Sequence, residues 1–178
     1  MTYLLFLTQL IFAAPLPLTS SSQSLGFEKD LFVSKSHQLK ISAENTDWFL
    51  NPQIKKSKSV LSEYRSENVY YGVQPAITLR VNTLNEKTSL KKYMKTWMKD
   101  YPKLGFQILN SKPFKLNGEV AFLLDLYNKD NKRQLRQVIT LKNKKVAIMT
   151  CRSHYKAFKK IVGDCNQIAQ NFHWLDNN

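Results

Sequence analysis

The chain has 178 residues, a length that fits one domain whose hydrophobic core needs no metal or covalent help. Its 27 lysine and arginine residues outnumber 13 aspartate and glutamate residues, and the net charge of +14 favours anionic partners such as nucleic acid, lipid head groups, acidic polysaccharide or an acidic protein. With five glycines in the whole chain and no GxGxxG, P-loop or GxSxG motif, the sequence gives no support to nucleotide-binding or serine-hydrolase chemistry, and we predict no cofactor.

The N-terminal segment is apolar and carries no charge before Glu28. Residues 3–14 are too few to span a bilayer as a helix but are typical of the hydrophobic region of a secretory signal. No lysine or arginine precedes this run, and Pro15 directly after Ala14 would obstruct cleavage there, so an N-terminal core helix or strand is the alternative. We predict a signal peptide and linker in residues 1–24 and a single exported domain in residues 25–178, periplasmic or extracellular, with no transmembrane span after processing.

Short strands are predicted in the first part of this domain. HQLKISA alternates Leu39 and Ile41 with polar neighbours, and the NTDWFLNP that follows has the residues of a turn around Trp48. Further strands are expected at SVLSEYRS and AITLRVNTL. The second of these strands has one apolar face, made of Ile77, Leu79 and Val81.

The segment TSLKKYMKTWMKDYPKLG predicts an amphipathic helix. Thr88 or Ser89 can cap its start, and Pro102 with Gly105 ends it. Membrane-surface helices show a similar pattern, but we expect the apolar side, Trp97 included, to pack in the core and the lysine side to face water. The apolar side consists of Leu90, Tyr93, Met94, Trp97, Met98 and Tyr101, and the opposite face carries Lys91, Lys92, Lys95 and Lys99.

Four strands then follow as a predicted antiparallel meander. FQILNSKPFKL is extended with a kink, the Asn117-Gly118 pair is a strong hairpin signal, and EVAFLLDLYN has an apolar centre typical of a strand buried on both faces. Turns at NKDN and KNKK lead into KRQLRQVITL and VAIMTC. Asp125 is either a buried, hydrogen-bonded residue or a mark of the exposed face of its strand, and we predict no catalytic role for it.

The last segment, from about Tyr155, predicts a second amphipathic helix packed on the sheet. At about 100° per residue its apolar residues fall in a stripe about 120° wide. Cys165 lies in the middle of this stripe and therefore faces the sheet. The stripe contains Phe158, Ile161, Val162, Cys165, Ile168, Ala169 and Phe172.

The two cysteines of the chain, Cys151 and Cys165, are expected to be joined if the protein is exported, and two independent buried thiols are the alternative. A disulfide needs Cα atoms about 5 to 6 Å apart. A helix that starts near Ala157 places Cys165 about 12 Å along its axis. We therefore expect the pair to close only if residues 152–156 form a loop or if the helix crosses the strand steeply.

The same stretch has two reactive interpretations. A thiol hydrolase or redox centre would use Cys151 as nucleophile and His154 as base, with Asp164 nearby, but no known nucleophile signature surrounds them. A metal site would use both cysteines with His154 and His173, at spacings that match no usual zinc pattern, and we predict no metal.

The order of these elements resembles the PsbP-like superfamily, whose members include thylakoid-lumen photosystem II extrinsic proteins and a nuclear import factor that binds the GTPase Ran. The resemblance covers roughly residues 37–174 and rests on HQLKISAENTDW, SVLSEYRS with PAITLRVNTL, LKKYMKTWMKDY, FKLNGEVAFLLDL, RQVITLKNKKVAIMTC and FKKIVGDCNQIAQNFHW. It implies an α+β fold, an α/β/α sandwich with a central antiparallel sheet and helices packed on its faces. Characterised members act as accessory binding proteins rather than enzymes, and no partner-binding residue carries over, because no partner-contacting motif is shared.

These observations predict an exported, non-catalytic accessory or binding domain whose partner is an unknown protein or an anionic envelope component, with a membrane surface among the candidates. The alternatives are a Cys/His-dependent enzyme and a nucleic-acid-binding protein; expected export and the expected burial of Trp97 argue against the latter. A solvated lysine surface without a partner is the simplest alternative for the charge. The proposed partner-binding residues are Lys91, Lys92, Lys95, Lys99, Lys142, Lys144 and Lys145.

Overall fold

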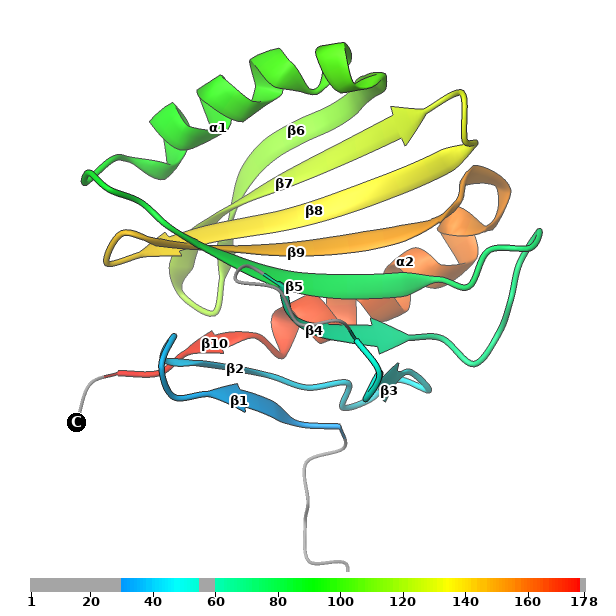
Figure 1. The fold of residues 1–178 in the computed structure, drawn as a ribbon, viewed down its shortest axis with the longest axis horizontal. Helices are drawn as coiled ribbons and strands as arrows, with labels where there is room; N and C mark the ends of the chain where they lie inside the picture. Colours follow the sequence, from blue (N-terminus) through cyan, green and yellow to red (C-terminus); the bar gives the residue numbers. More distant parts are fainter. Residues whose placement is uncertain (1–29, 55–59, 177–178) are drawn as a thin grey trace, which may run out of the picture.

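A computed structural model describes residues 30–54 and 60–176, so the predicted signal peptide and linker lie outside the described residues. A seven-stranded antiparallel sheet forms the centre, with helix α1 (Leu90–Asp100) on one face and helix α2 (Tyr155–Gln170) on the other (Figure 1). The predicted α+β sandwich is therefore confirmed. In spatial order the strands are β3 (Phe49–Leu50), β4 (Val60–Arg65), β5 (Ala76–Thr83), β9 (Lys145–His154), β8 (Arg133–Lys142), β7 (Glu119–Asn128) and β6 (Phe106–Leu116).

A second, three-stranded sheet lies beside α2. It consists of β1 (Phe32–Ser34), β2 (Leu39–Ile41) and β10 (His173–Trp174), so segments from the two ends of the described chain pair with each other (Figure 1). The predicted strand with buried Leu39 and Ile41 is present, but its place in a separate sheet was not predicted. Strands of two or three residues carry too little pattern to reveal which strand they pair with.

The main core lies between the large sheet and α2. The predicted apolar stripe of α2 packs there, with Val162 partly buried and its other members buried. Trp48 is also buried in this core: it follows the predicted turn, in which the Thr46 hydroxyl donates to the Ala43 carbonyl, and leads directly into β3. The Tyr64 hydroxyl donates to the Ile41 carbonyl at 2.8 Å and so ties the large sheet to the small one.

The predicted meander from β6 to β9 is present, and its hairpins have the expected turn chemistry. Asn117 and Gly118 both have positive φ, 50° and 85°, which a two-residue turn of this kind requires. The Asn117 side chain also donates to the carbonyls of Gln170 and Phe172, so this hairpin anchors the end of α2. The predicted kink in β6 is a register shift between Ile108 and Asn110.

The connection between β9 and α2 differs from the prediction. Residues 152–156 are not a loop, because β9 continues to His154 and α2 starts at Tyr155. The helix runs back beneath the sheet (Figure 1), and the Cα atoms of Cys151 and Cys165 are 5.9 Å apart.

The expectation of a large separation counted only the rise along the helix and left out the rise along the strand. From Cys151 to Tyr155 the strand covers about 13 Å, and from Tyr155 to Cys165 the helix returns about 15 Å. The two distances nearly cancel, so a helix that reverses over its own strand brings the two residues to the same level.

Candidate functional site

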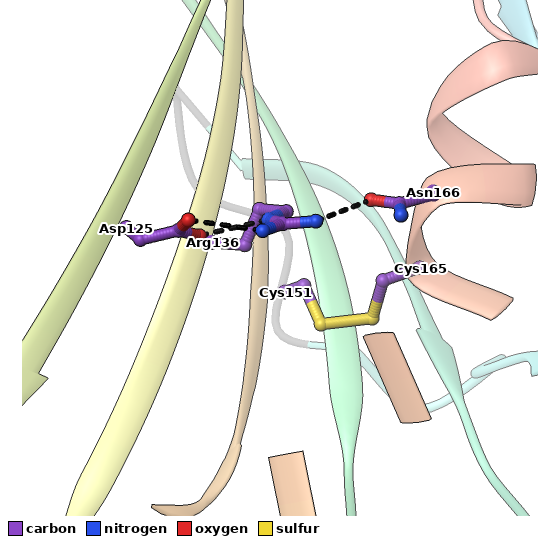
Figure 2. Close-up of a disulfide and its surroundings, with 5 residues drawn as sticks. All are labelled: Asp125, Arg136, Cys151, Cys165 and Asn166. Atoms are coloured by element: carbon purple, nitrogen blue, oxygen red, sulfur yellow. Dashed lines mark hydrogen bonds and ion pairs between the residues drawn. A yellow bond between two sulfur atoms is a disulfide. The ribbon is translucent and has the colours of Figure 1, made fainter. Parts of the chain in front are cut away.

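The structure joins Cys151 and Cys165 in a disulfide, between the sheet and α2 (Figure 2). Both cysteines are buried, and the described residues contain no free cysteine. His154 follows Cys151 by three positions, so strand alternation directs the two side chains to opposite faces of the sheet. The His154 imidazole Nδ1 accepts from the backbone N–H of Lys156 and caps α2. The thiol centre considered as an alternative is therefore not assembled.

The metal site considered as an alternative is not assembled either. Sulfurs that are bonded to each other are not available as thiolate ligands, and His173 lies on β10 in the small sheet. Within residues 30–54 and 60–176, no cluster of three histidine, cysteine or acidic side chains could hold a metal ion.

Asp125 is buried and bonded, the first of its two predicted alternatives. Its carboxylate oxygens accept from Arg136 Nε and Nη2 at 2.8 and 2.9 Å, and Arg136 Nη1 donates to the Asn166 side chain of α2 at 3.1 Å (Figure 2). The paired donors of the guanidinium match the two oxygens of the carboxylate. This arrangement links β7, β8 and α2 beside the disulfide, and we interpret it as structural.

Helix α1 sits on the other face of the sheet through a narrow contact. The Ser89 hydroxyl accepts from the backbone N–H of Lys92, so Ser89 is the cap of the two predicted candidates, Thr88 and Ser89. Met94 is buried and Tyr101 is 8% exposed. The helix ends at Asp100, and Gly105, in the left-handed region at φ 78°, closes the short 3₁₀ turn that follows. Met94 is the one buried residue of the helix itself, and a hollow lies along each side of the helix. The residues that pack partly buried against the same cluster are Leu90, Tyr93 and Met98.

The predicted burial of Trp97 is wrong: its side chain is 37% exposed. Met94 points at the sheet, and Trp97 lies about 60° around the helix from it, at 100° per residue. The stripe of apolar residues is wider than the contact that the helix makes, so residues toward its margin remain accessible. Trp97 stands between Tyr93 and Tyr101, with ring centroids 6.2 Å away on each side.

The first hollow, which we call the aromatic cleft, lies between these three rings and strands β5, β8 and β9, and has a volume of about 190 Å³. Its lining is mostly apolar but includes a polar chain: the Tyr101 hydroxyl donates to Gln137 Oε1, and Gln137 Nε2 donates to the Thr150 hydroxyl at 3.3 Å. Burial raises the pKa of Tyr101 to about 12, against the lowering effect of its bond to Gln137, so Tyr101 is a neutral donor at physiological pH.

The second hollow, which we call the apolar groove, lies on the other side of α1, above β6 and β7. Its volume is about 430 Å³. It is lined by Met94 and Met98 of α1, Ile108 of β6, Phe122 of β7, and three lysines at four-residue steps along the helix, Lys91, Lys95 and Lys99.

The seven predicted partner-binding lysines fall into two groups. Lys91, Lys92, Lys95 and Lys99 are exposed on α1, and none of them forms an ion pair with a carboxylate of the described residues. The lysines of the β8–β9 turn already have partners within the protein. Lys142 pairs with Asp176 at 2.8 Å and Glu119 at 4.0 Å, Lys144 donates to the Asn85 carbonyl, and Lys145 donates to the Ser36 carbonyl.

A charged cluster that no sequence pattern predicted surrounds Glu63, on the face of the sheet that α1 leaves open. The buried Glu63 carboxylate accepts from Arg65 at 2.7 Å, Arg152 at 3.0 Å and Asn51 at 3.0 Å. Burial opposes its ionisation, but the bonds from Arg65 and Asn51 and the charges of both arginines outweigh burial, so the pKa of Glu63 is lowered. No sequence signal connects Glu63 with Arg152, because they are 89 positions apart.

Comparison with solved structures identifies the fold. No protein-family model matches the sequence, and no curated protein is significantly similar to it. The structure is similar to CyanoP, the cyanobacterial PsbP of Synechocystis, at a TM-score of 0.60 and 13% identity over 88% of this chain and 98% of that one. The chain therefore has a PsbP-like fold, as the sequence resemblance implied.

Two other solved structures are similar to this chain. PA94 of Pseudomonas aeruginosa, a protein of unknown function, has a TM-score of 0.59 and 14% identity over 83% of this chain and 97% of that one. LpqN of Mycobacterium tuberculosis, which is involved in cell envelope biogenesis, has a TM-score of 0.58 and 16% identity over 83% of this chain and 86% of that one. At these identities the similarity establishes the fold. In the described part of the chain, neither helix has the length and apolar character needed to cross a bilayer.

Proposed function

We propose that the protein is an exported, non-catalytic binding domain that holds an anionic partner of the cell envelope on helix α1. The observation that carries this proposal is the row of exposed lysines on α1, three of which line the apolar groove. The one acidic residue of this helix, Asp100, pairs with Lys103 and not with a lysine of the row. The lysines of the β8–β9 turn extend the same positive surface, since Lys144 contacts the segment that leads into α1. Clustered cations of this kind raise the local concentration of anionic ligands.

Two observations support export and the absence of catalysis. A disulfide between buried cysteines fits an oxidising compartment, periplasmic or extracellular, and LpqN, which has the same fold, is involved in cell envelope biogenesis. The disulfide also removes the thiolate that a cysteine-dependent enzyme would need.

The test is binding to heparin and to vesicles with and without anionic phospholipid, at low salt and at ~0.5 M salt. We expect binding to the anionic probes at low salt, and at least a ~10-fold loss when Lys91→Glu and Lys95→Glu are combined. Lys156→Glu with Lys159→Glu is the matched control, because both lysines are exposed on α2, across the sheet. Equal losses in the two double variants, or no binding to any anionic probe, would refute the proposal.

Exposed Trp97 favours a second candidate function, the binding of single-stranded nucleic acid. An accessible indole between two tyrosines can stack on bases, and stacking is worth about 1 to 3 kcal/mol per base. Oligonucleotide titration monitored by Trp fluorescence tests it. Salt-sensitive quenching that Trp97→Ala removes would support this function, and unchanged fluorescence at low salt would exclude it.

A further inference from the structure

The apolar groove has the shape of a binding site that the fold leaves open. Met98, Ile108 and Phe122 line it and are only partly buried, so they present apolar surface to the groove. Met94, which also lines it, is buried. Its volume of about 430 Å³ falls within the range of sites for small molecules. Replacing water with hydrocarbon in a hollow of this size is favourable, because it removes the apolar walls and the hydrocarbon from contact with water.

Charge defines one side of this groove. Lys91, Lys95 and Lys99 lie along α1 at four-residue steps, so their side chains follow one edge of the groove on consecutive turns. Their aliphatic stems can line the groove while the ammonium groups remain in water. Among the residues that the structure describes, none of those that line the groove is acidic. The site therefore combines an apolar trough with a positive rim and complements a molecule that has one apolar part and one anionic end.

The chemistry of the lining distinguishes hydrocarbon from peptide. Apart from the three ammonium groups, the lining side chains of Met94, Met98, Ile108 and Phe122 offer no strong hydrogen-bond donor or acceptor. An extended peptide laid in the groove would leave backbone N–H and C=O groups unpaired, at a substantial cost. An alkyl chain carries no such groups.

We propose that the apolar groove binds a single-chain anionic amphiphile of the fatty-acid type as a free molecule, with its alkyl chain between α1 and strands β6 and β7 and its carboxylate among Lys91, Lys95 and Lys99. This inference rests on the proposed function for the role of the α1 lysines, and it specifies the class of ligand that they recognise.

The experiment measures binding to the full chain by calorimetry with three probes below their micelle concentrations: dodecanoate, octanoate and dodecyltrimethylammonium. We expect dodecanoate to bind with a stoichiometry of one. Each methylene removed should weaken binding about two- to fourfold, because a shallow groove recovers part or all of the ~0.8 kcal/mol per buried methylene. The cationic probe, which has the same chain length, should bind at least ~10-fold more weakly than dodecanoate.

Two variants locate the ligand. Met98→Glu puts a negative charge into the groove and should abolish dodecanoate binding, and Lys95→Glu should weaken it at least ~10-fold. The matched control for Met98→Glu is Thr96→Glu, which introduces the same charge on the exposed side of the same helix. Lys95 is exposed, so its variant keeps the test valid if Met98→Glu does not fold.

Equal affinity for the anionic and cationic probes, no dependence on chain length, or full binding to Lys95→Glu would overturn the inference. If heparin binds but dodecanoate does not, the inference fails and the proposed function stands. If dodecanoate binds as expected while heparin and anionic vesicles do not, α1 recognises a small amphiphile and the proposed docking of anionic envelope components fails.

Discussion

At the scale of single residues, the Glu63 cluster shows how a buried carboxylate remains ionised. Two arginines and an amide supply hydrogen bonds and positive charge that the unfolded chain lacks. A pKa that is lower in the folded protein than in the unfolded chain means that ionised Glu63 stabilises the fold.

We therefore predict that Glu63→Gln lowers the free energy of unfolding at neutral pH, on the order of 1 to 3 kcal/mol, because the arginines lose their charged partner. The stabilisation is present above the ordinary glutamate pKa, ~4.3, and is lost as pH falls through the lowered pKa of Glu63. Urea unfolding of both proteins across the acid range measures this difference. The exposed Glu67→Gln serves as control, and a difference that stays constant from neutral pH to below the folded pKa would contradict the prediction.

Trp97 shows that periodicity predicts the direction of a side chain but not its exposure. Its position in the apolar stripe correctly predicts the sheet-facing side of α1, yet its side chain is accessible. Periodicity reports which way a residue points, but exposure depends on how much of the sheet lies beneath it.

At the scale of secondary-structure elements, the β8–β9 hairpin holds a lysine in an unfavourable conformation. Asn143 and Lys144 both have positive φ, 49° and 64°. Asparagine tolerates this region, whereas lysine does so at a cost that glycine avoids.

Lys144→Gly should therefore raise the free energy of unfolding by about 0.5 to 1 kcal/mol, a gain that thermal unfolding can measure. The proposed partner binding should weaken at the same time, because one cation is lost. Lys112→Gly is the control: Lys112 is exposed in β6 without a positive φ, so glycine there should destabilise the protein. A lower melting temperature for Lys144→Gly would show that its bond to the Asn85 carbonyl outweighs the backbone strain.

The disulfide connects two elements that are already adjacent in sequence, β9 and α2. It closes a loop with a sequence separation of 14, for which the chain-entropy model gives a stabilisation of about 3 kcal/mol. Cys151→Ala with Cys165→Ala should lose about this amount in urea unfolding. Wild-type protein in reductant should move toward the same midpoint. Identical midpoints for the oxidised protein and the double variant would contradict the prediction.

At the scale of the whole molecule, the two faces of the sheet are unequally covered. Helix α2 has six buried residues, and a disulfide and the hydrogen bond from Asn117 also hold it. Helix α1 has eleven residues, of which only Met94 is buried. Isolated helices of this length are marginal in water. The stability of α1 therefore depends on its narrow contact with the sheet.

We predict that amide hydrogens of α1 exchange at least ~10-fold faster than those of α2, through local opening that leaves the sheet intact. Hydrogen exchange followed by mass spectrometry or NMR measures this. A saturating amphiphile in the apolar groove should slow exchange in α1 and leave α2 unchanged. Equal protection of the two helices in the free protein would show that the face carrying α1 is as firmly closed as the other.

The sequence by itself determined the elements whose periodicity is long enough to be unambiguous. Both helices, a cap at Thr88 or Ser89, the four-strand meander and its Asn117-Gly118 turn follow from local spacing and turn chemistry, which depend on neighbouring residues alone. The resemblance built on their order gave the sandwich architecture.

Only the tertiary structure decided what depends on contacts between distant segments. The pairing of β2 with β10, the Glu63–Arg152 ion pair and the accessibility of Trp97 all require positions in space that local pattern does not encode. The two hollows beside α1 have the same origin, because a cavity is a property of the space between elements. The cysteine pair lies between these cases: the sequence named both residues, and the reversal of α2 over β9 brought them together.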